Sequence, residues 1–297
     1  MKNVPPRQQP DMDFSEADTL RLRAVGAQRA HAAARGATYA RQIAWQALIK
    51  VPEITIYFWI VKLLTTAMGE STSDYLVYQI NPYLAVALGC LGLVVALALQ
   101  LLVRRYIAWV YWLAIVMVAI FGTMAADVMH VVLGIPYLVS TVFFASALAV
   151  IFIIWYASER TLSIHTIYPG RRELFYWATI MATFALGTAA GDLTADTFGL
   201  GYFTSILLFA VLFALPGLAF WLLGFNEIAA FWLSYIVTRP LGASVADWLG
   251  KPYLGGLGLG DARVSLVLTV LIVIFVGYLT ITRKDTQGKA QVTQGRR

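Results

Sequence analysis

The chain has 297 residues, of which 60% are apolar and only 13% are charged, and its formal net charge is +6. Ordinary soluble domains carry about 25% charged residues, so this composition excludes a typical soluble domain and indicates an integral membrane protein. The basic residues gather in the tails and in short loops, which does not favour nucleic-acid binding. Cys90 is the only cysteine, so no disulfide within the chain is expected.

Residues 1–44 form a polar, basic tail that we expect in the cytoplasm. Basic arms of this kind commonly touch anionic lipid, and a specific docking helix is the alternative. Ser15 to Asp18 precede an Ala- and Arg-rich stretch and could begin such a helix. The first apolar segment begins near Val51, behind this tail, so we expect no cleavable signal peptide.

Apolar runs of about 20 residues, the length that crosses a bilayer as a helix, then follow one another along the chain. A spanning barrel would instead show short alternating strands. The predicted class is therefore an all-α membrane protein with eight transmembrane helices. Their expected ranges are 53–73, 80–103, 106–128, 135–157, 173–194, 199–223, 227–248 and 263–282.

One pattern occurs four times without a gap: an aromatic residue and Trp, then Gly ten residues after the Trp, then Asp five residues later. The copies are Trp59, Gly69 and Asp74; Trp112, Gly122 and Asp127; Trp177, Gly187 and Asp192; and Trp232, Gly242 and Asp247. Self-similarity at a fixed spacing indicates internal repeats. Each repeat supplies one helix with the pattern and a plainer second helix.

The expected organisation follows from these repeats. Repeat 1 spans residues 45–103, repeat 2 spans 104–158, repeat 3 spans 173–225 and repeat 4 spans 226–283. A charged cytoplasmic connector, 159–172, separates the two halves, and residues 284–297 form a second cytoplasmic tail.

Lys and Arg residues predict the orientation. They precede the first helix and recur after the second, fourth and eighth helices, as in Arg104, Arg172 and Lys284. Because that side collects most of the positive charge, it is expected to be cytoplasmic, with both termini inside. All four repeats then run the same way, as parallel repeats related by an axis along the membrane normal.

Helical geometry puts each Trp near the cytoplasmic end and each Asp toward the outer end of a broad common face. We interpret the tryptophans mainly as an interfacial aromatic belt, and otherwise as a plug at the inner mouth. The glycines are interpreted as notches that let helices approach closely.

The acids carry the functional hypothesis, because a carboxylate inside a membrane is costly unless it is paired, hydrated or protonated. Glu70 precedes Asp74 by four residues and Asp196 follows Asp192 by four, so two repeats carry acid pairs. The expected ion-binding or proton-relay residues are Glu70, Asp74, Asp127, Asp192, Asp196 and Asp247.

Two basic residues inside predicted spans, Lys62 and Arg239, are the expected counter-charges. His130, Thr188 and Ser244 are accessory candidates. Carboxylate and hydroxyl oxygens suit protons or hard cations better than soft metals, and the metal itself stays unspecified. No cofactor is expected, apart from a bound hard cation. The glycine-rich stretch 255–261 has no P-loop context and predicts a flexible outer loop or a short re-entrant turn.

The chain resembles the bacterial membrane proteins built from four tandem copies of a two-helix repeat of unknown function, each marked by a tryptophan. The matching pieces are Lys50–Glu53 leading into Phe58 and Trp59, Gly69–Glu70 with Asp74, Thr161–His165, Gly187–Asp192 and Thr238–Ser244. The resemblance covers about Val51 to Thr282. It implies eight spans and four repeats, and it carries no activity.

The leading hypothesis is a transporter or channel for a small cation, proton-coupled or specific for a hard divalent metal, in a bacterial inner membrane. The first alternative is a non-transporting scaffold or sensor whose acids only form salt bridges with Lys62 and Arg239. The second is an enzyme acting on a lipid-linked substrate, although no catalytic motif is present. Expected partners are membrane lipid and a small cation. The sequence does not determine the oligomeric state.

Overall fold

The computed structural model describes residues 48–286 without a gap and, in the tail, residues 21, 23, 27–29, 31 and 33–37. The chain divides into two units, Met1–Ala47 and Leu48–Arg297. In the first unit the described residues are helical and exposed. The helix start predicted at Ser15 lies outside the described residues.

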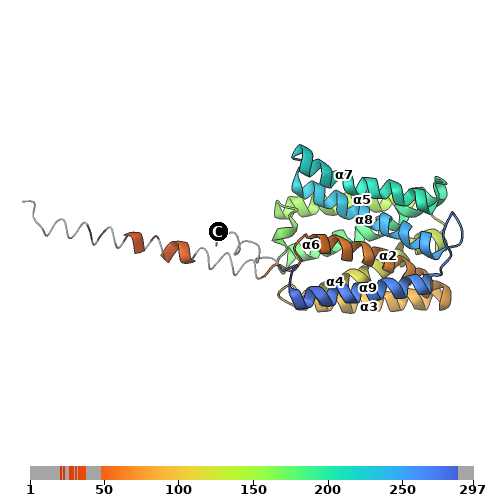
Figure 1. Ribbon diagram of the computed structural model, residues 1–297, viewed down its shortest axis with the longest axis horizontal. Coiled ribbons are helices and arrows are strands. Elements are labelled where there is room, and N and C mark those ends of the chain that lie inside the picture. The colour runs from red at the N-terminus through yellow and green to blue at the C-terminus, as the bar shows by residue number, and fades with distance from the viewer. Residues whose placement is uncertain are drawn as a thin grey trace, which may run out of the picture. The chain divides into compact units, whose positions relative to one another are not determined.

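The described part of the second unit contains eight long α-helices and no strand (Figure 1), which confirms the predicted class. Their bounds are α2 (Ile56–Gln79), α3 (Pro82–Leu102), α4 (Ala108–Asp127), α5 (Tyr137–Glu159), α6 (Arg171–Asp192), α7 (Gly201–Leu223), α8 (Glu227–Gly250) and α9 (Asp261–Thr282). Short π-helical turns, η1 (Val128–Val132) and η3 (Leu193–Thr197), extend α4 and α6, and a 3₁₀ turn, η2 (Ile164–Thr166), lies in the connector.

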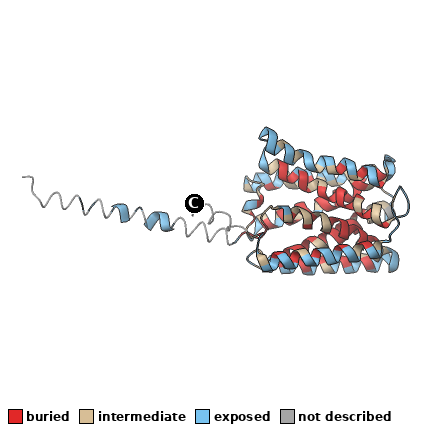
Figure 2. Cartoon of the chain, in the orientation of Figure 1, coloured by how far each residue is buried: buried red, intermediate tan, exposed pale blue. Residues whose placement is uncertain are grey.

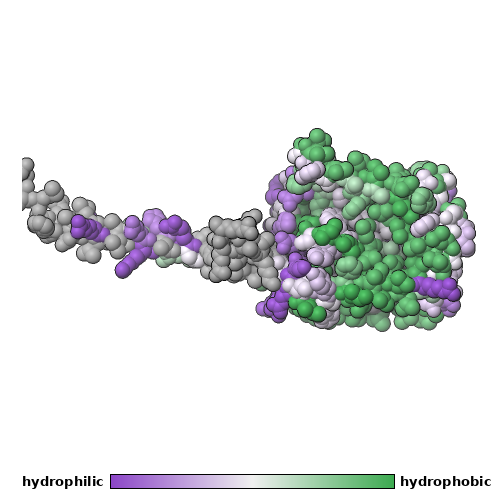
Figure 3. All heavy atoms as spheres, viewed as in Figure 1, coloured by the Kyte–Doolittle hydropathy of each residue, from purple (hydrophilic) through white to green (hydrophobic). Residues whose placement is uncertain are grey.

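Seven of these helices are long and apolar enough to span a membrane. Helix α2 is absent from that set because Lys62, Glu70 and Asp74 lower its hydropathy, although its 24 residues are long enough to cross. Figure 3 shows hydrophobic side chains covering the middle of the visible bundle face, with polar residues toward its two ends. Such a surface is what a multi-pass membrane protein presents to lipid.

The four helices that carry the repeated pattern form a closed inner ring. Helix α2 packs against α4 and α8, and α6 packs against the same two helices. Each second helix lies mainly outside the ring and on the first helix of the following repeat: α3 on α4, α5 on α6, α7 on α8 and α9 on α2. Figure 2 accordingly shows buried residues concentrated on the inner helices and exposed faces on the outer ones.

The repeated glycines explain how the ring closes. A Cβ on Gly69 would overlap Ala119, one on Gly122 would overlap Phe184, one on Gly187 would overlap Arg239, and one on Gly242 would overlap Thr66. In every case the contacted residue lies seven positions after the Trp of the next repeat. The glycine of the fourth repeat contacts the equivalent residue of the first repeat, so the contacts form a closed cycle. Glycine at these four positions therefore permits the close helix approach that small residues provide in membrane bundles.

The aromatic pairs form a second cyclic layer at one end of the bundle, here called the aromatic end. Phe58 contacts Trp112 at 5.8 Å between ring centroids, Tyr111 contacts Trp177 at 5.8 Å, Tyr176 contacts Trp232 at 6.3 Å, and Phe231 contacts Trp59 at 5.8 Å. Each pair again joins one repeat to the next.

For three of the four repeat tryptophans this packing contradicts the interpretation as an interfacial belt, while Trp59 is half-buried. Trp112, Trp177 and Trp232 are at most 4% exposed, so these indoles lie inside the protein and not against headgroups. The Tyr111 and Tyr176 hydroxyls are hydrogen-bonded to each other at 2.6 Å within the same layer. The aromatic residues pack against one another across this end of the ring.

Buried polar contacts fix the segments that flank the ring at the aromatic end. Lys50 lies 2.5 Å from the Glu173 carboxylate and donates to the Gln100 carbonyl at 2.6 Å, and all three residues are buried. The Tyr106 hydroxyl donates to the buried Asp285 carboxylate. Burial raises the pKa of both groups. Asp285, just past α9, is thereby joined to the start of α4.

Replacing Gly242 with Ala tests the glycine contacts. The new methyl group would overlap Thr66, and overpacking of this kind typically costs about 1–3 kcal/mol of unfolding free energy. Gly277 is the matched control, since a Cβ there meets nothing within 4 Å and alanine favours a helix. Unfolding free energies measured in bicelles should fall for Gly242→Ala and stay level or rise slightly for Gly277→Ala. If the two variants were equally stable, the claim that Gly242 is needed for close helix packing would be wrong.

Candidate functional site

The end of the ring opposite the aromatic layer, here called the acid end, holds two repeat aspartates joined by a lysine. The Lys251 ammonium lies 2.8 Å from Asp247 Oδ1 and 3.0 Å from Asp74 Oδ2. Burial alone would lower the pKa of Lys251, but the carboxylates of Asp247 and Asp74 outweigh it and raise this pKa well above its usual value. The ammonium is therefore charged at neutral pH, and it links repeat 1 to repeat 4.

One helical turn closer to the ring centre, Glu70 forms a fully buried ion pair with Arg239. The same guanidinium nitrogen also donates to the hydroxyls of Thr123 and Thr188, the latter at 2.7 Å. Thr123 donates to Glu70 at 3.3 Å, which completes a network among all four repeats. Glu70, Thr123 and Thr188 each follow a repeat glycine directly, so equivalent positions of three repeats converge on the arginine of the fourth.

The other two repeat aspartates face the same region. Asp127 interacts electrostatically with Glu70, Asp74 and Asp192, and Asp192 interacts with Glu70, Asp74 and Lys251. Asp127 and Asp192 are thus linked electrostatically to the acid end, but the close carboxylate group there consists of Glu70, Asp74 and Asp247. Asp127 and Asp192 also end their α-helices, and each is followed by a π-helical turn, a feature frequent at functional sites.

Several predicted site residues do not reach this group. Asp196 is exposed within η3. The His130 imidazole is hydrogen-bonded to the Ile135 carbonyl at 2.9 Å and stacks on Tyr137. The Ser244 hydroxyl is buried without a hydrogen-bond partner in the described part of the chain.

Lys62 differs most from its predicted role as a counter-charge. Its buried ammonium has no hydrogen-bond acceptor among the described residues and lies over the rings of Phe184, at 3.9 Å, and Tyr235, at 4.2 Å. Cation–π contacts of this kind stabilise a desolvated ammonium. The structure therefore does not bring Lys62 to the acids.

Sequence reasoning missed Thr123 and Lys251. Thr123 aligns with Glu70 and Thr188 in the repeat, which was a usable signal. Lys251 follows Asp247 by four residues, the spacing of a helical ion pair, but it lies beyond the predicted end of its helix at residue 248. Only the packing of repeat 4 against repeat 1 shows that its second carboxylate partner is Asp74.

The glycine-rich stretch after Lys251 folds back on the end of α8. The Leu257 amide donates to the Trp248 carbonyl at 2.6 Å, the Gly258 amide to Lys251 at 3.1 Å and the Leu259 amide to Leu249 at 2.9 Å. These bonds satisfy carbonyls that a helix terminus leaves unpaired. Backbone hydrogen bonds therefore hold this segment against the end of α8.

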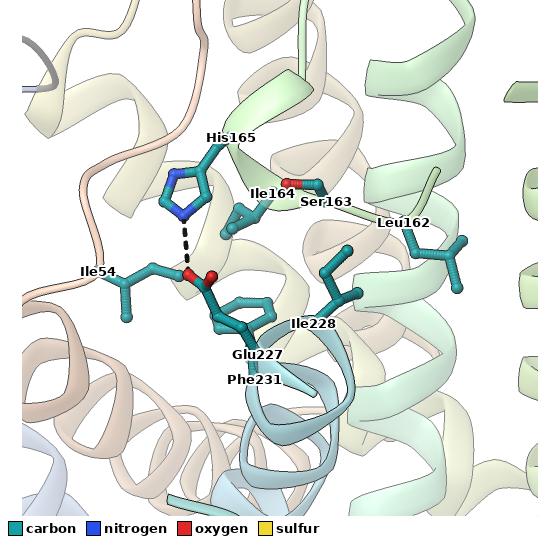
Figure 4. Close-up of a pocket in the computed structure, with 8 residues that line it drawn as sticks. All are labelled: Ile54, Leu162, Ser163, Ile164, His165, Glu227, Ile228 and Phe231. Atoms are coloured by element: carbon teal, nitrogen blue, oxygen red, sulfur yellow. Dashed lines mark ion pairs between the residues drawn. The ribbon is translucent and has the colours of Figure 1, made fainter. Parts of the chain in front are cut away.

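A pocket of about 110 Å³ lies at the aromatic end, away from the acids (Figure 4). His165 of η2 and Glu227 at the start of α8 are 3.6 Å apart at this pocket, which is lined below by Ile54, Ile228 and Phe231. Phe231 also belongs to the aromatic layer. This contact therefore joins the connector between the two halves to the helix that starts repeat 4.

The chemistry of the acid end suits a hard cation. Glu70, Asp74 and Asp247 each place a carboxylate oxygen within 4.8 Å of the others, and Glu70 and Asp247 are buried. Ca²⁺, Mg²⁺ and Mn²⁺ prefer such oxygen ligands. The same carboxylates could equally exchange protons, so geometry alone does not separate a metal ion from a proton.

Fold and site together define a multi-pass helical membrane protein built from four cyclically packed two-helix repeats. A family model described as Repeat of Unknown Function (DUF347) matches residues 57–106, 110–161, 175–224 and 230–285. The chain belongs to this family, and each matched segment contains one helix with the Trp, Gly and Asp pattern and the helix that follows it. No curated protein and no solved structure matched the chain.

Replacing Arg239 with Met tests the buried network. The variant leaves the Glu70 carboxylate buried without its cation, which typically lowers the unfolding free energy by about 3–5 kcal/mol. The double variant Arg239→Met with Glu70→Leu should recover part of that loss in bicelle unfolding measurements, because no charge is then stranded. Arg263→Met, an exposed control at the start of α9, should change little. If Arg239→Met proved as stable as this control, the buried network would not contribute to the stability of the protein.

Proposed function

We propose that this protein moves a small cation, either a proton or a hard divalent metal ion, across a membrane. The observation that supports the proposal is the close group of the Glu70, Asp74 and Asp247 carboxylates at the acid end of one closed ring, to which Asp127 and Asp192 are linked electrostatically. Carboxylates grouped at membrane depth are costly, and in membrane proteins they commonly mark ion or proton pathways. The residues proposed to bind or relay the ion are Glu70, Asp74, Asp127, Asp192 and Asp247.

The ends of the ring differ in a way that favours a carrier over an open pore. Beyond the acids, the path along the ring meets the Arg239–Glu70 pair and then the aromatic layer. An ion that entered at the acid end would pass only after these contacts rearranged. Such alternating exposure is the usual mode of transporters whose repeats rock against one another.

The proposed setting is a bacterial inner membrane with both termini in the cytoplasm. The aromatic end carries Arg104, Arg171, Arg172 and Lys284, while Lys251 and Arg263 are the basic residues at the acid end. The Lys and Arg bias supports an orientation with the aromatic end inside. The acids then face the periplasmic side, where ions would first reach them.

Flux measurements test the proposal. Asp74, Asp127, Asp192 and Asp247 are each replaced by Asn, and proton and Mn²⁺ uptake into proteoliposomes is followed with trapped dyes. Loss of a carboxylate from the pathway should lower flux by about tenfold or more, since one charged ligand is removed from a low-dielectric site. Glu227→Gln, a highly exposed acid at the aromatic end, is the control and should keep wild-type flux. Wild-type rates in all four Asn variants would rule the proposal out.

The scaffold or sensor alternative has one specific observation in its favour: the Arg239 network alone ties the four repeats together without any ion. Under that alternative, wild-type proteoliposomes would show no more flux than empty liposomes, while Arg239→Met would still be destabilised. The enzymatic alternative has no specific contact in its favour among residues 48–286.

A further inference from the structure

The backbone at Lys251 is held in place by neighbouring residues, and this fixes where its side chain lies among the acids. It follows the last residue of α8 in extended conformation, and its side chain is only 14% exposed. The glycine-rich turn bonds to its carbonyl through Gly258, and a Cβ on Gly256 would overlap that same carbonyl oxygen. Unlike an ordinary surface lysine, this residue has a fixed base from which its ammonium reaches both carboxylates.

The lysine is unique to one repeat. It lies nineteen residues after Trp232, and the equivalent positions in the other repeats hold Tyr78, Val131 and Asp196. The ring therefore supplies four aspartates but one lysine at this depth. The chain itself thus places a single cation between carboxylates of the first and fourth repeats.

The position of this ammonium is the one a free cation would take. Its nitrogen lies 3.0 Å from Asp74 and 2.8 Å from Asp247, and both carboxylates belong to the group whose oxygens, with Glu70, fall within 4.8 Å of one another. An ammonium and a metal ion placed together between these carboxylates would repel each other strongly, because both are positively charged. The two cations cannot occupy the space between these carboxylates together.

We propose that Lys251 is a tethered competitor for the transported ion, so that a cation binds between Asp74 and Asp247 only when the ammonium leaves. This inference rests on the proposed function and narrows it to one substrate class. A monovalent metal ion offers the carboxylates no more charge than the lysine it would displace, whereas a divalent ion offers twice as much. The site therefore selects hard divalent cations, and the lysine re-enters it once the ion departs.

Binding to the purified full-length protein tests this directly. Free Mn²⁺ is counted by electron paramagnetic resonance during titration of wild type, Lys251→Met and Lys284→Met. The second variant removes the same charge from an exposed lysine at the aromatic end. We expect Lys251→Met to bind Mn²⁺ about tenfold more tightly or better, as removal of a neighbouring positive charge predicts. Lys284→Met should match wild type. Adding Asp74→Asn to Lys251→Met should abolish the gain.

Three outcomes would overturn the inference, and they separate it from the proposed function. If wild type and Lys251→Met bind Mn²⁺ equally, the lysine does not compete, and the cation site stands. If both lysine variants bind Mn²⁺ more tightly by the same factor, the gain comes from the change in net charge and not from displacement of the Lys251 ammonium. If no variant binds Mn²⁺ while each remains monodisperse and folded, the divalent form of the proposed function fails with it.

Discussion

The centre of this protein depends on one buried guanidinium. Arg239 is fully buried and contacts Glu70, Thr123 and Thr188, so every repeat contributes to one network. An unpaired charge at this depth would be strongly destabilising, and the ring can therefore only close when all four inner helices are in register. The glycines make this possible, since Gly187 leaves room for the Arg239 side chain itself.

Around that centre the four repeats share a geometry and differ in chemistry. Glycine contacts and aromatic pairs follow the same cyclic order, from each repeat to the next and from the fourth back to the first. The polar positions break this symmetry: only repeat 1 has Glu70, and only repeat 4 has Arg239 and Lys251. A symmetric frame with asymmetric charges gives a site that is built between repeats 1 and 4.

This asymmetry gives the two ends of the ring different capacities. Tightly packed rings close the aromatic end, whereas carboxylates and one lysine occupy the acid end. A cation that binds at the acid end must rearrange the charged side chains that are already paired there. The His165–Glu227 contact at the other end joins the connector to α8 beside Phe231.

The sequence by itself determined the class, the eight helices and the four repeats, and it marked the aspartates that occupy equivalent positions. These properties are local or periodic, since hydropathy marks spans and fixed spacing marks equivalent positions. The tertiary structure alone decided that three of the four repeat tryptophans are buried, that Lys62 rests on aromatic rings and that Lys251 joins Asp74 to Asp247. Those outcomes depend on which helix faces which across a closed ring, and a helix's own sequence does not specify its neighbour.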